Sequence, residues 1–181
     1  MEEFSNKTEE NIYNLLKKLK IDYEEIVHDE VISSEDSFNI RKNAGWQDFT
    51  SAKNILFHAK GKFYLVVLNY DKVIKARIFK KEFGTKNIRF ATKEELKEIL
   101  NLSSGEVVSL GLENPSVPIY VDKDIFNFKF FAFTPANKRK SLKISTNDLL
   151  RIYENIRNPV TVFYIDSNGS LILEELKKEG E

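Results

Sequence analysis

The residues best suited to chemistry are a lysine and an asparagine, Lys53 and Asn54, which precede a short apolar run. That run is followed by a polar turn containing Gly61 and by residues 63–68, which are apolar at every position. Two such runs around a glycine turn predict a hairpin, and the second run predicts a strand buried on both faces. A cation and an amide beside a buried hairpin could bind a phosphate or a ribose. The alternative is that both side chains lie at a solvated strand end.

Two further stretches could contribute to a binding site. In residues 109–115, Gly111 directly follows a predicted strand, so a ligand could approach the backbone closely and an N–H group could hold a carbonyl oxygen. Residues 133–141 form a basic loop that contains Lys138, Arg139 and Lys140. A plain turn is the alternative for the first stretch, and a solvated hairpin loop is the alternative for the second.

The sequence lacks the patterns of several common catalytic sites. It has no cysteine, which excludes disulfides, thiolate nucleophiles and cysteine-ligated zinc. The seven glycines are scattered, so there is no phosphate-cradling loop and no dinucleotide fingerprint. The histidines, His28 and His58, lack an activated-serine motif, and no acidic cluster has metal-ligand spacing. We therefore predict no cofactor and no metal, and we interpret both histidines as ordinary strand-end residues.

The composition is that of a soluble globular protein. The chain has 181 residues, enough for one domain with a substantial core, and 41% are hydrophobic and 31% charged. Its 28 basic and 28 acidic residues balance, so any nucleic-acid contact has to use a local basic patch. No apolar run approaches the roughly 20 residues needed to span a bilayer, and the acidic N-terminus is not a secretory signal. We expect a cytoplasmic protein with no membrane partner.

Hydrophobic periodicity predicts helices and strands that alternate along the chain. The expected helices cover residues 6–19, 33–45, 71–84, 92–100 and 145–156, with one helical turn at 122–126. The expected strands cover residues 22–28, 50–58, 63–68, 87–90, 106–110, 117–121, 128–133, 141–144 and 159–165. No linker separates them, so residues 1–181 are predicted to form a single α/β domain with a mixed central sheet flanked by helices. Residues 167–181 are predicted to be a C-terminal tail, as a short helix or a frayed end.

Taken in order, several segments resemble the YbaK/prolyl-tRNA synthetase-associated editing domain family. The most specific is Ala52-Lys53-Asn54-Ile55-Leu56-Phe57, which is similar to the family's Lys-Asn-Leu-Phe strand. The other segments are residues 28–31 with 33–36, residues 90–96 with 105–107 and 110–114, and residues 133–135 with 145–150. The resemblance runs from the first helix to the strand at residue 159. It implies the YbaK-like fold.

The resemblance also implies an activity, the hydrolysis of mischarged aminoacyl-tRNA. The Lys-Asn pair is similar to the freestanding branch that removes alanine from proline tRNA, so the expected reaction is hydrolysis of the Ala-tRNA(Pro) ester in trans. The implied partner is the aminoacylated 3′ end of tRNA, and prolyl-tRNA synthetase is a further candidate partner. The family's reaction needs no protein nucleophile, because a water or the ribose hydroxyl is positioned for attack.

Site roles are carried over from the resemblance position by position. The matching lysine of the family engages a phosphate near the 3′ end of the tRNA, and Lys53 inherits this role. Asn54 is expected to orient the terminal sugar or the aminoacyl group, and the backbone of Gly111 is expected to hold the ester carbonyl. The remaining residues assigned to substrate binding are Leu112, Asn114, Thr134 and Lys138.

The chain departs from the family pattern in the basic loop. The family commonly has His-Pro where this chain has Thr134-Pro135, and it commonly has Asn where this chain has Lys138. Threonine keeps a hydroxyl but cannot act as imidazole does. The departure leaves an alternative open, in which the protein is a catalytically weak relative that binds tRNA or a synthetase.

Overall fold

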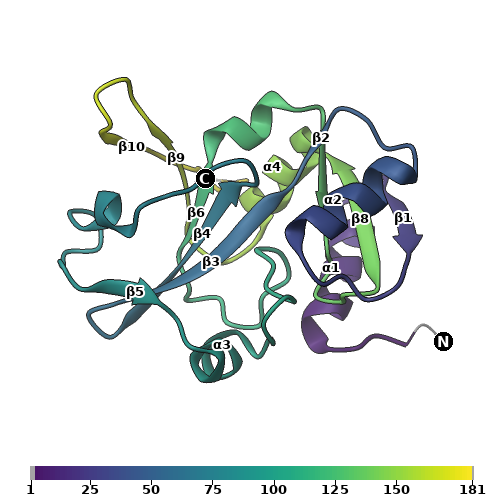
Figure 1. Cartoon of the computed structure of the whole chain (residues 1–181), viewed down its shortest axis with the longest axis horizontal. Helices are drawn as coiled ribbons and strands as arrows, with labels where there is room; N and C mark the ends of the chain where they lie inside the picture. The colour runs from purple at the N-terminus through teal and green to yellow at the C-terminus, as the bar shows by residue number, and fades with distance from the viewer. Residues whose placement is uncertain (1–2, 181) are drawn as a thin grey trace.

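The computed structural model describes residues 3–180, which form two mixed β-sheets with helices packed around them (Figure 1). The smaller sheet has the strand order β1-β8-β7-β2, and the larger has the order β10-β9-β6-β4-β3-β5. The strands are β1 (Glu24–Val27), β2 (Phe49–Thr50), β3 (Ala52–Ala59), β4 (Lys62–Asn69), β5 (Ile88–Phe90), β6 (Ile119–Asp122), β7 (Phe130–Phe133), β8 (Lys140–Ser145), β9 (Val160–Ile165) and β10 (Leu171–Glu175). The helices are α1 (Lys7–Lys18), α2 (Ser34–Asn43), α3 (Lys93–Leu100) and α4 (Thr146–Asn155), with 3-10 turns η1 (Ala76–Phe79) and η2 (Lys123–Asn127). The predicted mixed α/β fold is confirmed, with its sheet divided into two.

One extended segment takes part in both sheets. Strand β2 pairs in parallel with β7 in the smaller sheet, where Phe49 faces Phe130. After Ser51 the same segment continues as β3, which pairs antiparallel with β4 in the larger sheet over its whole length. The predicted hairpin is therefore confirmed, and the two sheets diverge at Ser51.

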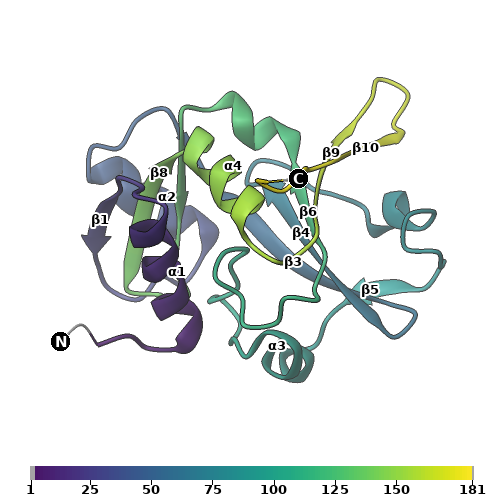
Figure 2. The same cartoon turned by 180° about the vertical axis from the view of Figure 1, so that it is seen from behind.

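The helices begin where their capping residues predict. The side chains of Asn6, Ser33, Thr92 and Ser145 each accept a hydrogen bond from a backbone N–H in the first turn of the helix that follows. Thr92 also forms a capping box with Glu95. Helices α1 and α2 lie on opposite faces of the smaller sheet, as the front and back views show (Figures 1 and 2). None of the helices formed by residues 3–180 has the length and hydrophobicity to cross a bilayer.

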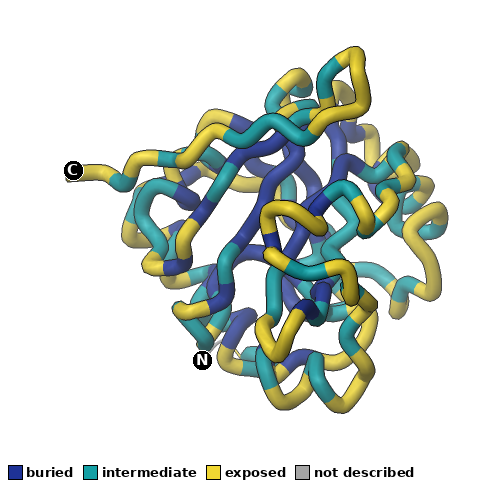
Figure 3. The backbone as a smooth tube through the Cα atoms, turned by 90° about the vertical axis from the view of Figure 1, so that its left-hand side faces the viewer, coloured by how far each residue is buried: buried dark blue, intermediate teal, exposed yellow. Residues whose placement is uncertain are grey.

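The central strands of the larger sheet lie in the interior (Figure 3). Strand β4 is buried from Leu65 to Asn69, and β6 is buried over its whole length. This confirms the prediction of a strand covered on both faces. A main apolar cluster joins the two sheets, and a second, aromatic cluster lies around Phe57, Phe79 and Phe83.

The predicted helix at residues 71–84 is wrong. The segment leaves β4 through a turn and forms only the short 3-10 turn η1 before Gly84. Phe79 and Phe83 pack into the aromatic cluster, whereas Val73 is 90% exposed, so the apolar residues do not share one helical face. Val73, Ile74 and Ile78 are also β-branched, which disfavours helix in the absence of such a face.

Two other predictions fail for reasons of pairing. Residues 106–110 are buried in part but form no strand, and the carbonyl of Val107 accepts a hydrogen bond from the Asn54 side chain. The C-terminal stretch is not a helix or a frayed tail. Strand β10 pairs antiparallel with β9, and the turn between them is held by the carboxylate of Asp166. A hairpin signal was present there in Asp166-Ser167-Asn168-Gly169.

Gly111 packs directly against α1. Its φ is +70°, and a Cβ atom built on it would lie 2.9 Å from Ile12 Cγ1 and 3.0 Å from both the Ile12 nitrogen and the Thr8 oxygen. Two of these three neighbours are helix backbone, which cannot move aside cheaply. The Asn11 side chain also donates to the Gly111 carbonyl at 3.0 Å. Glycine is therefore required here to seat the first helix.

We expect Gly111→Ala to lower the free energy of unfolding by about 2–4 kcal/mol, since it adds a steric clash to a left-handed backbone. Urea unfolding measures this loss. Gly169→Ala is the matched control, because Gly169 has a φ of +77° and a Cβ atom built on it would meet nothing within 4 Å. The control should lose only about 1–2 kcal/mol. Equal losses in the two variants would contradict the packing role of Gly111.

Candidate active site

A cleft of about 780 Å³ lies where the two sheets diverge. This volume is within the range of small-molecule sites. One wall is β3 from Ala52 to Leu56, and the opposite wall is the end of β7 from Phe131 to Thr134. Residues 30–41, which include the start of α2, and the loop around Gly105 also contribute to the lining. Four of the predicted site residues line this cleft, and they are Lys53, Asn54, Thr134 and Lys138.

Lys53 is held in the cleft by the loop after β4. Its Nζ donates to the carbonyl oxygen of Lys72 at 2.8 Å. An ammonium has three donors, so this bond leaves two others for a ligand. The position of Lys53 thus depends on how the Lys72 backbone is fixed.

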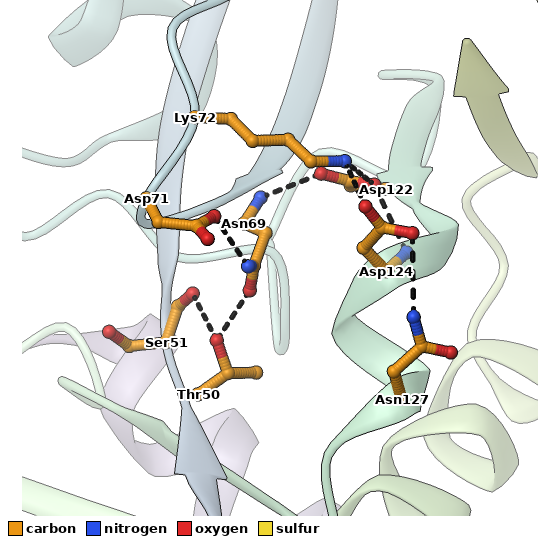
Figure 4. A network of polar contacts seen from close by, with 8 residues as sticks. All are labelled: Thr50, Ser51, Asn69, Asp71, Lys72, Asp122, Asp124 and Asn127. Atoms are coloured by element: carbon orange, nitrogen blue, oxygen red, sulfur yellow. Dashed lines mark hydrogen bonds and ion pairs between the residues drawn. The ribbon is translucent and has the colours of Figure 1, made fainter. Parts of the chain in front are cut away.

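A buried carboxylate fixes that loop (Figure 4). Asp122 is 0% exposed and accepts from the Asn69 backbone at 3.0 Å and from Lys72 Nζ at 2.9 Å. Lys72 also pairs with Asp124, and Asn69 donates to Asp71 at 2.7 Å. Burial by itself lowers the pKa of Lys72, but the hydrogen bonds to Asp124 and Asp122 outweigh it and raise that pKa above its ordinary value. Lys72 therefore keeps its charge at neutral pH and loses it only at alkaline pH.

Asn54 links β3 to the loop on the other side of the cleft. Its Nδ2 donates to the Val107 carbonyl at 3.1 Å, which fixes the orientation of the amide. Its Oδ1 is buried and has no hydrogen-bond partner among residues 3–180. Buried acceptors of this kind are uncommon, and Asn54 Oδ1 is an acceptor that the described residues leave unsatisfied.

Arg41 is the residue that sequence reasoning missed. It lies in α2, is 3% exposed and reaches the floor of the cleft. Its guanidinium donates to Ser141 Oγ at 3.1 Å, to Thr134 Oγ1 at 3.2 Å and to the Ala132 carbonyl at 3.5 Å. Burial lowers the pKa of Arg41 to about 10, so it remains charged at neutral pH. Arg41 lies three residues after Phe38, which packs against the buried Trp46 and Phe49. This helical spacing was the available signal that Arg41 faces the interior.

Lys138 closes one end of the cleft. Its Cε lies 3.0 Å from where a Cβ on Gly105 would be, so its side chain passes over that glycine. Its Nζ lies 3.5 Å from the exposed carboxylate of Glu30. Of the other two basic residues in this loop, Lys140 turns away to the buried Glu9, at 3.5 Å, and Arg139 is exposed. Gly105 therefore lines the cleft, whereas Gly111 does not.

The other predicted site residues lie elsewhere. Gly111 and Leu112 line a separate groove of about 320 Å³ beside α1. Asn114 holds a turn, since its Nδ2 donates to the Ile99 carbonyl at 3.3 Å and its Oδ1 accepts from the Ser116 backbone at 3.0 Å. None of the three is among the residues that line the cleft. The predicted convergence of Lys53 and Gly111 on one cleft is therefore wrong, because the glycine is used to pack α1.

A serine and a histidine do meet, but in a closed position. His28 Nε2 lies 2.9 Å from Ser141 Oγ, and His28 Nδ1 lies 2.7 Å from the Asp29 carbonyl. Ser141 is 0% exposed and does not line the cleft. A substrate cannot reach its oxygen, so this pair is structural. His58 packs its ring against Phe63 on the hairpin, and no group of three or more possible metal ligands occurs in the described part of the chain.

Comparisons with known proteins show the family of the chain. Residues 38–152 match the family described as the aminoacyl-tRNA editing domain. The prolyl-tRNA editing protein ProX of Acetoanaerobium sticklandii is 30% identical over 142 residues, which cover 76% of this chain and 85% of that protein.

Two solved structures show the same fold at low identity. One is described as a candidate trans-editing enzyme for prolyl-tRNA synthetase, with 16% identity, a TM-score of 0.63, and coverage of 87% of this chain and 96% of that one. The other, hypothetical protein APE2540, has 16% identity, a TM-score of 0.66, and coverage of 91% and 99%.

We expect Asp122→Asn to lower the free energy of unfolding by about 1–3 kcal/mol, because it removes the charge that pairs with Lys72 inside the protein. Urea unfolding at neutral pH measures the loss. Asp124→Asn is the matched control, since this carboxylate pairs with the same lysine but its side chain is 48% exposed. Its loss should stay under about 1 kcal/mol. An Asp122→Asn protein as stable as the control would show that the buried charge does not hold the loop.

Proposed function

Because the chain belongs to the aminoacyl-tRNA editing domain family, we propose that it hydrolyses the ester of mischarged proline tRNA in trans, and that alanine is the amino acid removed. The observation that carries the proposal is the placement of Lys53 and Asn54 together in the cleft where the sheets diverge. The choice of alanine rests on the Lys-Asn pair, which is similar to the alanine-removing branch of the family.

The charge of the cleft suits the end of a tRNA. Lys53 has donors to spare for a phosphate, and Lys138 lies at one end of the same cleft. Phe90, 66% exposed, and Ile32, 89% exposed, lie on the rim. Exposed aromatic rings beside cations are typical of sites that bind single-stranded nucleic acid, because each base can stack on a ring. The 3′ end of tRNA is such a strand.

We infer that the nucleophile is a water, which the ribose hydroxyl of the substrate helps to position. The aminoacyl ester is already activated, so positioning and electrostatic stabilisation can supply the rate. Within residues 3–180, the lining of the cleft contains hydroxyls but no imidazole or thiol. Rejection of proline would be steric, because a small pocket excludes a ring far more strongly than it discriminates against a missing methylene.

A second candidate function is tRNA or synthetase binding with little turnover. The observation that favours it is Thr134 in the cleft wall, because the resemblance suggests that the family commonly has histidine at this position. This alternative predicts salt-dependent tRNA binding without hydrolysis. A deacylation panel with Ala-tRNA(Pro), Cys-tRNA(Pro) and Ser-tRNA(Pro) separates the two functions. Hydrolysis of Ala-tRNA(Pro) at the highest rate supports our proposal, and folded protein that hydrolyses none of the three refutes it.

We expect Lys53→Ala to lower kcat/KM for Ala-tRNA(Pro) by about 10- to 100-fold, because a charged hydrogen bond to phosphate is lost. Single-turnover deacylation measures this effect, and circular dichroism checks the fold. Lys62→Ala is the matched control, since Lys62 is an exposed lysine of the same hairpin that does not line the cleft. The control should keep wild-type activity. Unchanged turnover in Lys53→Ala would remove Lys53 from the site.

A further inference from the structure

The charge of Arg41 is buried without a carboxylate. Within the described residues, no acidic side chain lies within ion-pair distance of its guanidinium, which contacts only two hydroxyls and one carbonyl. Buried charges are normally paired, because an unpaired charge in a low-dielectric interior is costly. An arrangement that leaves a positive charge uncompensated at the floor of a cleft favours negative charge in that cleft.

The contact with Arg41 decides what the Thr134 hydroxyl can do. A guanidinium has only donors, so Thr134 Oγ1 must accept from it and must point its own hydrogen elsewhere. None of residues 3–180 accepts that hydrogen. Thr134 is partly exposed and lines the cleft. The hydroxyl is therefore a free donor in the cleft, and the adjacent positive charge polarises it.

Ser141 shows the opposite outcome with the same arginine. Its oxygen also accepts from Arg41, but its hydrogen can be donated to His28 Nε2 when that ring is neutral. The Nδ1 of the ring faces a carbonyl oxygen, so Nδ1 carries the proton and Nε2 accepts. Arg41 thus orients two hydroxyls, one satisfied in the interior and one left for a ligand.

We propose that Thr134, oriented by Arg41, donates a hydrogen bond to the ester carbonyl oxygen of the bound aminoacyl end. Thr134 is then a catalytic residue and Arg41 a positioning residue. This inference rests on the proposed function. It gives the carbonyl a donor in the cleft that contains Lys53 and Asn54, which the Gly111 backbone cannot provide from its place beside α1.

The bond strengthens during the reaction. The oxygen of the attacking water forms a bond to the carbonyl carbon, and the carbonyl π electrons move onto the carbonyl oxygen. Thr134 donates to that oxyanion without transferring its proton. When the carbonyl re-forms, the bond to the 3′ oxygen breaks, and that oxygen takes the proton released by the attacking group. A donor placed where charge develops acts chiefly on kcat.

Thr134→Val tests the donor, because valine keeps the shape of threonine and removes the hydroxyl. We expect kcat for Ala-tRNA(Pro) to fall about 100-fold while KM changes less than about threefold. Thr134→Ser should retain most of the activity. Thr161→Val on β9, outside the cleft, is the matched control and should match wild type.

Arg41→Lys tests the positioning role in a double-variant cycle with Thr134→Val. Lysine keeps the charge but cannot contact both hydroxyls as the planar fork does. We expect Arg41→Lys to lower kcat in the wild-type background and to have no further effect when Thr134 is already valine. A purely structural role would lower stability and would reduce kcat equally in both backgrounds. Ser141→Ala, which removes the buried hydroxyl, should lower stability and leave kcat within about threefold of wild type.

The outcomes separate the two proposals. If Thr134→Val hydrolyses Ala-tRNA(Pro) as fast as the wild type, the role of Thr134 is overturned. The deacylase function would still stand. Equal effects of Arg41→Lys in both backgrounds would overturn the role of Arg41. Wild-type protein without turnover on any of the three esters would overturn the deacylase function, and this inference with it.

Discussion

The extended segment from Phe49 to Ala59 belongs to two sheets, and the rest of the architecture follows from this constraint. Its first residues pair in parallel with β7, and its later residues pair antiparallel with β4. A strand that leaves one sheet for another forces the two sheets apart at the crossing point, here Ser51. The cleft lies at this divergence, and Lys53 and Asn54 come directly after it. The cleft therefore exists because the sheets separate, and the residues of β3 just beyond the crossing form one of its walls.

Each wall is held by one buried charge. On the side of β3, Asp122 fixes the loop whose carbonyl binds Lys53, and it has cationic and backbone donors to satisfy it. On the side of β7, Arg41 holds Thr134 and Ser141, and its partners are all neutral oxygens. The two charges differ in consequence. The first is compensated within the protein and serves rigidity, whereas the second leaves positive potential facing the cleft. A site for a phosphate-bearing ester with a developing oxyanion benefits from both.

The departure of this chain from its family is physically interpretable in these terms. By the resemblance, threonine stands where the family commonly has histidine, and in this chain the charged Arg41 donates to that threonine. Membership of the family does not rest on the single residue Gly111. The family match extends over residues 38–152, and the relative ProX aligns with 76% of the chain. What changes is which glycine backbone lies in the cleft. Gly105, under the Lys138 side chain, is the glycine of the cleft, and Gly111 packs the first helix.

The sequence by itself determined the helix starts at Asn6, Ser33, Thr92 and Ser145, the long hairpin, and Lys53 and Asn54 as candidates for the site. Caps and periodic patterns are decided by residues a few positions apart, so they can be read locally. Only the tertiary structure decided that the sheet divides, that residues 71–84 form no helix, that the last strand pairs with β9, and that Arg41 enters the site. Arg41 meets its hydroxyl partners 93 and 100 residues further along the chain, and Gly111 is fixed by a helix that begins more than 100 residues before it. Burial and steric fit between such distant segments depend on the packed chain as a whole, and no local pattern records them.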